Sequence, residues 1–318
     1  MVGARRNVYS RLGLRYRRTV RALLVIAAFV PLIAWFTLPL ASGSQLPISV
    51  VVAGEPMAVF SLEKSGRATL ITLPSGVAVA AVYGYGTYSL EALWQLGTIE
   101  KKGGQLLSAS LSESLAVPLA WYIARRSGEA SGIAGLADLK RFFSPGAISR
   151  FLTGQYQTNL SLPRLVKLVS SVQGLTPDRL TAIDLRGRDV YRIEELPDGS
   201  QRKIIDSAKI DETIGSAMEL EEIRREALAV AIYNTTEVPA LGNRVARLLS
   251  RLGVIVVTTS NETPEVNECE VSGNKAAIST KTARLIIEFY RCRVTEKMGD
   301  GRADLELRIG TSYASRFL

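Results

Sequence analysis

Residues 22–41, ALLVIAAFVPLIAWFTLPLA, decide how the chain is organised, because they contain no charged side chain. A helix of this length rises about 30 Å, roughly the thickness of the hydrocarbon core of a bilayer. The stretch predicts a transmembrane helix, and Pro31 inside it is tolerated because neighbouring backbone groups adjust around it. A short arm, residues 1–21, precedes this helix, and the bulk of the chain follows it.

The charge of the arm predicts the direction of the helix. Residues 1–21 carry seven arginines and no acid, whereas the net charge of all 318 residues is +9. Short loops rich in Lys and Arg stay in the cytoplasm, so we expect the N-terminus inside the cell and the bulk of the chain outside. Because the arm accounts for most of the net charge, the composition does not indicate a nucleic-acid partner.

Two other interpretations of residues 22–41 remain open. The small residues Ala41, Ser42 and Gly43 would suit cleavage of a signal peptide. A signal peptide, however, has an apolar run of about 7–15 residues, which is shorter than this one. A buried core helix would not explain the arginines directly before it. We therefore favour a membrane anchor.

Histidine is absent, and the chain has two cysteines, Cys269 and Cys292. The first fact excludes catalytic triads, general bases and metal sites that use histidine. If the cysteines lie outside the cell, a disulfide between them is favoured, and a loop of about 23 residues makes it worth roughly 3 kcal/mol. Two unpaired buried thiols are the alternative.

Residues 46–210 predict an α/β domain. β-branched and apolar runs separated by turn residues predict strands, and Ser89 and Ser161 are suited to cap the helices that follow them. The expected strands are 46–54, 58–62, 68–73, 77–82 and 181–185, with a hairpin of 189–194 against 201–205. The expected helices are 90–99, 137–152 and 164–171. Residues 107–126 are mostly helical in pattern, with a junction at Val117-Pro118 and with 121–124 (WYIA) as either a strand or a helix end.

Residues 211–228 predict a charged linker helix into a second domain, residues 229–318. The order there is strand 229–233, helix 239–252, strands 254–259 and 268–271, helix 274–290, a strand end at 292–295 and strand 304–309. This β-α-β-β-α-β order predicts a small ferredoxin-like sandwich.

The second domain resembles the LytR C-terminal domain. The residues that carry the resemblance are 230–236 (VAIYNTT), 240–246 (ALGNRVA), 252–254 (LGV) and 307–313 (LRIGTSY). One departure is that the Asn-Gly of the family is Asn234-Thr235 here. Asn234 can still end a strand and accept a left-handed turn.

The first domain, over about 46–190, resembles the catalytic domain of the LytR–CpsA–Psr family. The resemblance rests on 55–76 (EPMAVFSLEKSGRATLITLPSG), 83–86 (YGYG) and 158–161 (TNLS) with the strand to Leu185. It implies a membrane-anchored enzyme that moves a wall polymer from a polyprenyl-pyrophosphate carrier onto peptidoglycan.

Two departures from the family bear on this activity. Glu55 keeps a carboxylate where the family has an Asp that supports Mg²⁺. Ser75 and Gly76 replace the Arg and Asp of its Pro-Arg-Asp motif. Pyrophosphate chemistry needs cations to offset developing charge, so the lost arginine predicts lost catalysis. The runs Arg125–Arg126 and 186–188 are interpreted as solvated surface charge.

The candidate residual ligand site consists of Glu55, Ser75, Tyr83 and Tyr85. The tyrosines, next to Gly84 and Gly86, could stack on sugar rings or be turn and core residues. Ser75 lies in a Pro-Ser-Gly turn that suits a nucleophile, but no histidine exists to activate it. We assign no catalytic residue, no metal ligand and no cofactor.

The sequence thus predicts a membrane-anchored extracytoplasmic cell-envelope protein that binds or scaffolds without catalysis. Its expected partners are the membrane, a wall polymer or lipid-linked precursor, and an envelope protein. The alternative is an active Mg²⁺-dependent phosphotransferase with Glu55 at the ion. A purely structural role is the third possibility.

Overall fold

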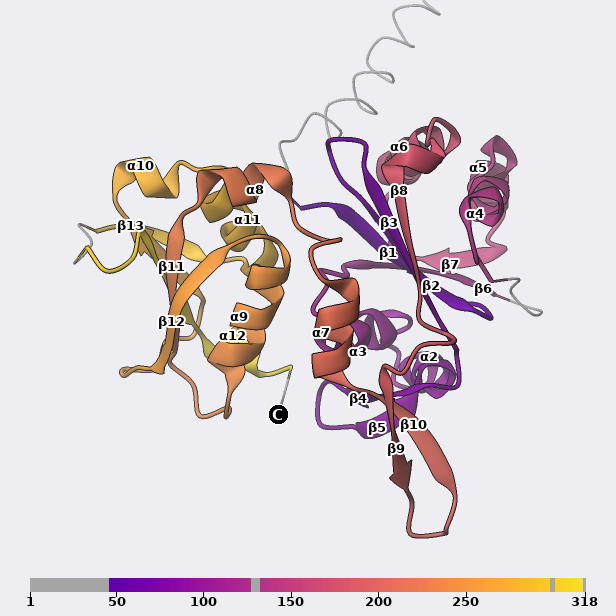
Figure 1. Ribbon diagram of the computed structural model, residues 1–318, viewed down its shortest axis with the longest axis horizontal. Coiled ribbons are helices and arrows are strands. Elements are labelled where there is room, and N and C mark those ends of the chain that lie inside the picture. The colour runs from indigo at the N-terminus through magenta and orange to yellow at the C-terminus, as the bar shows by residue number, and fades with distance from the viewer. Residues whose placement is uncertain (1–45, 127–131, 298–300, 317–318) are drawn as a thin grey trace, which may run out of the picture.

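The computed structural model describes residues 46–126, 132–297 and 301–316 (Figure 1). The predicted arm 1–21 and transmembrane helix 22–41 lie outside this range, so both stay predictions. Among the described residues, no helix combines the length and the apolar character needed to cross a membrane.

The first domain is built on a six-stranded mixed sheet with the order β7-β6-β1-β2-β3-β8. Strands β1, β2 and β3 are antiparallel neighbours, β6 runs parallel to β1, and β8 runs parallel to β3. The carboxyl ends of β1, β3, β6 and β8 therefore meet at one side of the sheet, which we call the carboxyl edge. The bounds are β1 (Ile48–Val52), β2 (Met57–Leu62), β3 (Ala68–Leu73), β6 (Trp121–Arg125), β7 (Tyr156–Thr158) and β8 (Leu180–Asp184).

Helices cover both faces of this sheet, which explains why β2 is apolar at nearly every position. Met57 and Val59 pack into one core, whereas Ala58 and Phe60 pack into another on the opposite face. This alternation is the period of a strand buried on both sides. The helices are α2 (Leu90–Ile99) and α3 (Gln105–Leu115) on one face, and α4 (Leu136–Phe142), α5 (Pro145–Leu152) and α6 (Leu162–Gln173) on the other.

Several predicted elements of this domain are confirmed. The hydroxyl of Ser89 accepts the backbone N–H of Ala92 at 3.2 Å, as expected for the cap of α2. The predicted helical pattern over 107–126 holds as far as Leu115, after which Ala116 takes a left-handed conformation and Pro118 follows. Of the two alternatives for residues 121–124, the strand is confirmed as part of β6. A short 3₁₀ turn, η1 (Pro177–Arg179), leads into β8.

A second, four-stranded sheet has the order β5-β4-β10-β9. The predicted hairpin is confirmed as β9 (Tyr191–Glu195) against β10 (Gln201–Ile205), and Gly199, at φ 78°, makes its turn. The hairpin projects from the bottom of the molecule in Figure 1. The other two strands are β4 (Ala78–Ala81) and β5 (Gly86–Ser89).

Two helices occupy the segment where one linker helix was predicted. The first, α7 (Ser207–Ile214), ends at Gly215, which has φ 49°. Its Ile210 and Ile214 pack into the core of the first domain. The second, α8 (Glu221–Glu226), packs Ile223 into the core of the second domain.

The second domain is a five-stranded mixed sheet with the order β12-β11-β15-β13-β14. Its strands are β11 (Ala229–Asn234), β12 (Ile255–Asn261), β13 (Glu270–Gly273), β14 (Arg293–Glu296) and β15 (Leu305–Ile309). Its helices are α9 (Leu241–Arg251), α10 (Lys275–Ile278), α11 (Lys281–Tyr290) and α12 (Thr311–Ala314).

The predicted ferredoxin-like topology is wrong. Residues 293–296 form a strand of their own, so the domain has five strands where that topology has four. The last strand, β15, lies between β11 and β13, parallel to the first and antiparallel to the second. The predicted helix 274–290 is instead two helices. Thr280 is the N-cap of the second one, α11, and its hydroxyl accepts the backbone N–H of Ala283.

The predicted disulfide between Cys269 and Cys292 is confirmed, with a Cα–Cα distance of 4.4 Å. The two cysteines directly precede β13 and β14, which are parallel neighbours in the register Glu270↔Arg293. The bond therefore joins one edge strand of the sheet to the strand beside it.

The domains contact each other through polar side chains, most of them partly buried, as well as through the connecting chain. Asp211 of α7 pairs with Arg247 and Arg251 of α9. Nearby, the hydroxyl of Tyr313 in α12 donates to Oε1 of Glu113 in α3 at 2.9 Å.

The carboxyl of Glu113 is expected to make the stability of the protein depend on pH. Burial raises the pKa of its carboxyl, and the hydrogen bond from Tyr313 and the charges of Arg316, Arg244 and Arg247 offset only part of this. The folded protein thus keeps a proton that the unfolded chain loses near pH 4.5, so stability falls as the pH rises from there through the folded-state pKa.

Replacing Glu113 with Gln removes this titration and keeps an acceptor for Tyr313. We expect the variant to be more stable than the parent at neutral pH and similar to it below about pH 4.5. Denaturant unfolding across this pH range measures the difference, with the exposed Glu212→Gln as control. Parallel curves for parent and Glu113→Gln would contradict the assignment.

Candidate functional site

Glu55 and Ser75 meet at the carboxyl edge. The register of β2 on β3 pairs Met57 with Leu73, so the residues two positions further out, Glu55 and Ser75, lie opposite each other. The backbone N–H of Ser75 donates to Oε2 of Glu55 at 2.9 Å, and the Ser75 hydroxyl donates to the same oxygen. These two members of the predicted site are therefore in direct contact.

Tyr83 and Tyr85 lie at the other end of α2. The Tyr85 hydroxyl donates to Glu100 just past the end of that helix, at 3.0 Å. The Ser75 carbonyl instead accepts the N–H of Glu91 in its first turn. Nine residues of helix separate Glu91 from Glu100, which is about 13 Å. The four predicted residues thus do not form one site.

The Tyr83 and Tyr85 rings share a cation. The Lys102 ammonium lies 3.9 Å from the Tyr83 ring centroid and 5.0 Å from that of Tyr85. A lysine held over both rings is a cation–π contact that fixes this turn. The pair is therefore better explained as local structure than as a sugar-stacking platform.

Asp184, Arg186 and Arg188 belong to the carboxyl edge, although the sequence analysis treated 186–188 as surface charge. Asp184 ends β8 directly beside Thr72 of β3, whose hydroxyl donates to it at 3.0 Å. The Arg186 guanidinium donates to both Asp184 carboxylate oxygens, at 2.9 and 2.8 Å. Arg188 donates to the Asp184 carbonyl at 3.1 Å.

The electrostatics of this cluster extend to Glu55. The paired Arg186 holds the pKa of the Asp184 carboxyl well below its usual range. The hydrogen bonds to Asp184, together with its charge, in turn raise the pKa of Arg186, and the charge of Glu55 adds a smaller effect in the same direction. Glu55 therefore lies within electrostatic range of the Asp184–Arg186 pair, beyond the ends of β3 and β8.

Arg125 and Arg126 reach the same edge from the other side. Arg125 ends β6, which runs parallel to β1, and the N–H of Ala53 bonds to the carbonyl of Ile123. After the segment that the structure does not describe, Gly132 donates to the Glu55 carbonyl at 3.1 Å. The chain after β6 therefore returns to Glu55.

Among the described residues, this edge thus carries two arginines at the end of β6 and two beyond β8, with three strands between the two pairs, and the carboxylates of Glu55 and Asp184. All four arginines are exposed, Arg186 is paired with the Asp184 carboxylate, and Arg188 donates to the Asp184 carbonyl. In open α/β sheets, ligands bind outside the carboxyl ends of the strands. An excess of guanidinium groups at that position suits an anionic ligand such as a phosphate. The sequence contained a signal for this placement, because each basic run lies at the end of a predicted or observed strand and both strands end at this edge.

The residues at this edge do not fit a resident Mg²⁺ ion. No group of three Asp, Glu, His or Cys residues in the described part of the chain could hold a metal ion. The Glu55 Oε2 atom already accepts two donors from Ser75, and both Asp184 oxygens accept Arg186. A hard cation needs several free oxygens in one place.

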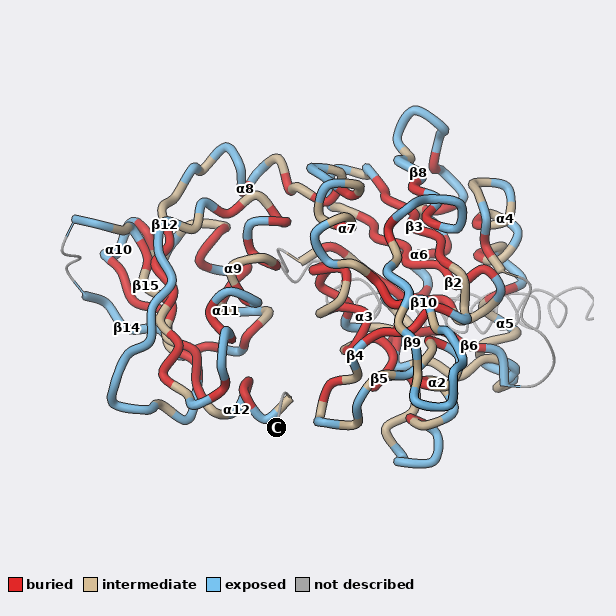
Figure 2. Tube along the Cα trace, turned by 60° about the horizontal axis from the view of Figure 1, so that its bottom comes forward, coloured by how far each residue is buried: buried red, intermediate tan, exposed pale blue. Residues whose placement is uncertain are grey.

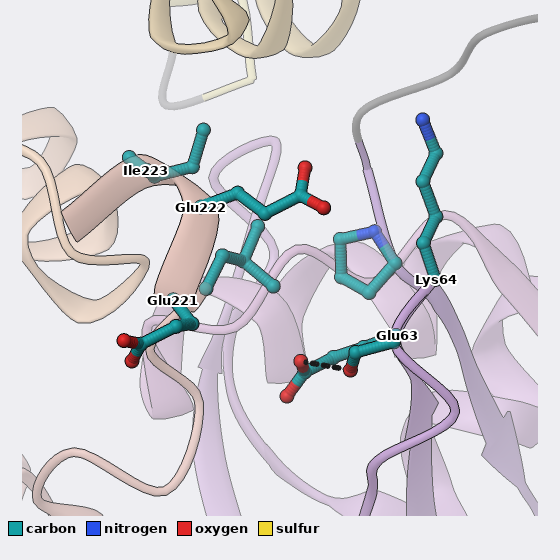
Figure 3. Close-up of a pocket in the computed structure, with 8 residues that line it drawn as sticks. Glu63, Lys64, Glu221, Glu222 and Ile223 are labelled. Atoms are coloured by element: carbon teal, nitrogen blue, oxygen red, sulfur yellow. Dashed lines mark hydrogen bonds between the residues drawn. The ribbon is translucent and has the colours of Figure 1, made fainter. Parts of the chain in front are cut away.

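A separate hollow lies where β1 and the β2–β3 turn meet α8 (Figure 3). Its volume of about 40 Å³ leaves space for little more than a water molecule. Its carboxylates are engaged: Glu63 with Ser65 and Arg67, Glu221 with Arg225, and Glu222 with Lys281. We interpret it as part of the contact between the domains.

The C-terminal part of the chain matches a known family. Residues 227–313 match the LytR_C family, described as LytR cell envelope-related transcriptional attenuator. These residues therefore form the LytR C-terminal domain that the sequence predicted. A comparison with curated proteins gave no match.

Solved structures resemble the chain weakly. TagV of B. subtilis is 12% identical over 54% of this chain and 95% of its own, with a TM-score of 0.37. The transcriptional regulator yvhJ of Bacillus subtilis is also 12% identical, over 54% and 94%, with a TM-score of 0.37. The transcriptional regulator EF0465 of Enterococcus faecalis is 10% identical, over 54% and 88%, with a TM-score of 0.36. Likenesses of this size carry no argument about activity.

Proposed function

We propose that this chain is a membrane-anchored, extracytoplasmic cell-envelope protein that binds an anionic wall polymer or its lipid-linked precursor without reacting with it. The observation that carries the proposal is the composition of the carboxyl edge, where guanidinium groups outnumber carboxylates. The LytR C-terminal domain supports a place in the envelope, and residues 22–41 supply the anchor.

The Glu55–Ser75 pair supports the absence of catalysis. Where the resemblance to the LytR–CpsA–Psr family expects an arginine, Ser75 instead donates two hydrogen bonds to Glu55. The carboxylate then secures the turn after β3. The edge keeps the positive charge that binds phosphate groups but loses the arginine that would offset charge developing during transfer.

Exposed arginines at the edge predict how binding responds to substitution. Removing one charge-assisted hydrogen bond to a phosphate weakens binding by about tenfold, or roughly 1.4 kcal/mol. We expect this loss for Arg126→Ala and Arg188→Ala, measured by titrating full-length protein in detergent with polyprenyl pyrophosphate. Arg284→Ala in the second domain is the control, since it removes an exposed arginine far along the chain. Equal affinity in all four proteins would exclude the edge as the site.

The same protein and ligand can be used to distinguish binding of polyprenyl pyrophosphate from its catalytic turnover. Full-length protein incubated with polyprenyl pyrophosphate and Mg²⁺ is expected to release no phosphate. Release that disappears in Glu55→Ala would overturn the non-catalytic part of the proposal and establish the phosphotransferase alternative. The binding titration would still decide independently whether the edge holds the ligand.

A further inference from the structure

Helix α6 begins and ends at the side of the first sheet where β1 starts. Strands β1, β3 and β8 all start at this side, which we call the amino edge, because their registers align Ile48, Ala68 and Leu180 through β2. Just before α6, the Asn159 side chain donates to the carbonyl of Ala120, next to the start of β6, at 2.9 Å. After α6, η1 leads into the start of β8. Figure 1 shows α6 at the top of the first domain.

The outer face of α6 is basic and carries no acid. Its inner face packs into the core of the first domain through Leu165, Leu168, Val169 and Val172. On the outside, Arg164 and Val166 are exposed and Lys167 is half-buried. In the described part of the chain, neither of these two cations has an ion-pair partner. The Arg164 guanidinium instead lies 5.2 Å from the ring centroid of Trp121, at the start of β6. The positive charge of this face is therefore not neutralised within the fold.

The start of β1 also places the amino edge close to the predicted anchor. Six residues, 42–47, separate the end of the predicted transmembrane helix from Ile48. A segment of six residues spans at most about 22 Å, even when fully extended. The carboxylates of the hollow beside Pro47 are paired, as described above, and leave no unbalanced negative charge there. The tether thus holds this side of the first domain within a short distance of the bilayer.

We propose that the outer face of α6, at the amino edge, rests on the outer surface of the membrane and contacts anionic lipid headgroups. This inference depends on the anchor that belongs to the proposed function. Basic side chains near a bilayer are attracted to anionic headgroups, and a helix on the membrane surface combines such residues with apolar ones, as Arg164, Val166 and Lys167 do here. Trp121 beside Arg164 fits the same interface. The carboxyl edge lies at the opposite ends of the strands and is therefore left free for its ligand.

The test uses the full chain in lipid nanodiscs, made either of phosphatidylcholine alone or with phosphatidylglycerol added. A water-soluble reagent acylates accessible lysines, and mass spectrometry gives the rate at each one. We expect Lys167 to react about fivefold more slowly in the anionic discs, since one basic side chain near an anionic surface gains about that factor. Lys203 is the internal reference, because it is exposed on the β9–β10 hairpin, at the bottom of the molecule in Figure 1. Figure 2 shows most of this hairpin as exposed, and we expect the Lys203 rate to be the same in both discs.

Two charge reversals separate the α6 face from the rest of the surface. Arg164→Glu keeps Lys167 as the reporter and is expected to bring its rate in anionic discs towards the rate in neutral discs. Arg192→Glu is the matched control, because it reverses an exposed arginine on β9 and should leave the Lys167 rate unchanged.

The outcomes distinguish the membrane contact from the anchor. Equal rates at Lys167 in the two kinds of disc would overturn the contact alone. Slowing of Lys167 and Lys203 to the same extent would overturn it as well, because the effect would not belong to the α6 face. A chain that stays with neither kind of disc would overturn the anchor, and with it this inference, whereas the binding titration at the carboxyl edge would keep its meaning.

Discussion

Replacing Asp211 with alanine is expected to lower the free energy of unfolding by about 2–3 kcal/mol, because it removes the carboxylate that pairs with both Arg247 and Arg251 at the domain contact. Oδ2 of Asp211 accepts Nε of Arg247 at 2.7 Å, and Oδ1 accepts a second Arg247 nitrogen at 2.8 Å. Arg251 also donates to Oδ1. One carboxylate thus balances two guanidinium groups.

Burial of Arg251 explains the size of this effect. Its side chain is only 5% exposed, and burial lowers its pKa, an effect that Asp211 opposes. Without Asp211, the charge of Arg251 keeps only neutral carbonyl partners, those of residue 211 and Gly215. Breaking a fully buried pair costs about 3–5 kcal/mol, and we expect less here since Asp211 is partly exposed to solvent.

The same arginines hold the two domains together. From α9 of the second domain, Arg247 also donates to the carbonyls of Glu113 and Ser114 at the end of α3, at 2.9 and 3.0 Å. The loss of Asp211 frees this guanidinium to move away from α3. We therefore expect the domains to unfold in a less cooperative transition in Asp211→Ala.

Asp189→Ala is the matched control for this prediction. Asp189 pairs with Lys209 of the same helix, α7, but its side chain is 88% exposed. Such a surface pair contributes about 0–1 kcal/mol. Denaturant unfolding of the three proteins, followed by circular dichroism, makes the comparison. If Asp211→Ala were no less stable than Asp189→Ala, the contact would not stabilise the fold as argued.

Local features of the chain could be predicted from sequence because their causes are local. The runs at 58–62 and 68–73 are apolar on both faces, and they became the buried strands β2 and β3. The strand order of the second domain could not be predicted, because it depends on where β15 pairs. That strand inserts between β11 and β13, and its partners are distant in sequence. Asn234, which pairs with Ile309, lies 75 residues earlier, and Val271, which pairs with Leu307, lies 36 residues earlier. Periodicity contains no information on such distant partners.

The contacts of the candidate site also differ in whether they could be predicted from the sequence. Glu55 and Ser75 flank an antiparallel pair joined by a short turn, so their contact could be expected from the alignment of 55–76. The contact of Thr72 with Asp184 joins residues 112 apart in sequence. Only the parallel pairing of β3 with β8 brings Arg186 near Glu55, and this pairing has no signature in the sequence of either strand.

Reducing the Cys269–Cys292 disulfide is expected to lower the free energy of unfolding by about 3 kcal/mol, since it closes a loop of 23 residues. The bond limits the conformations of the unfolded chain, and its loss releases that entropy. In the folded protein both cysteines are buried, at 2% and 8% exposure, so the reduced thiols would still pack in the core. The folded structure should therefore survive reduction while its stability falls.

Urea unfolding with and without reductant, followed by circular dichroism, measures this difference. The double variant Cys269→Ala/Cys292→Ala should unfold near the midpoint of the reduced parent, and reductant should not move it. If reductant shifted the double variant as far as the parent, its effect would not come from this bond. If the oxidised and reduced parent unfolded at the same urea concentration, loop closure would not contribute to stability. Because the bond joins the neighbouring strands β13 and β14, either result would also show how strongly that side of the LytR C-terminal domain depends on a covalent link.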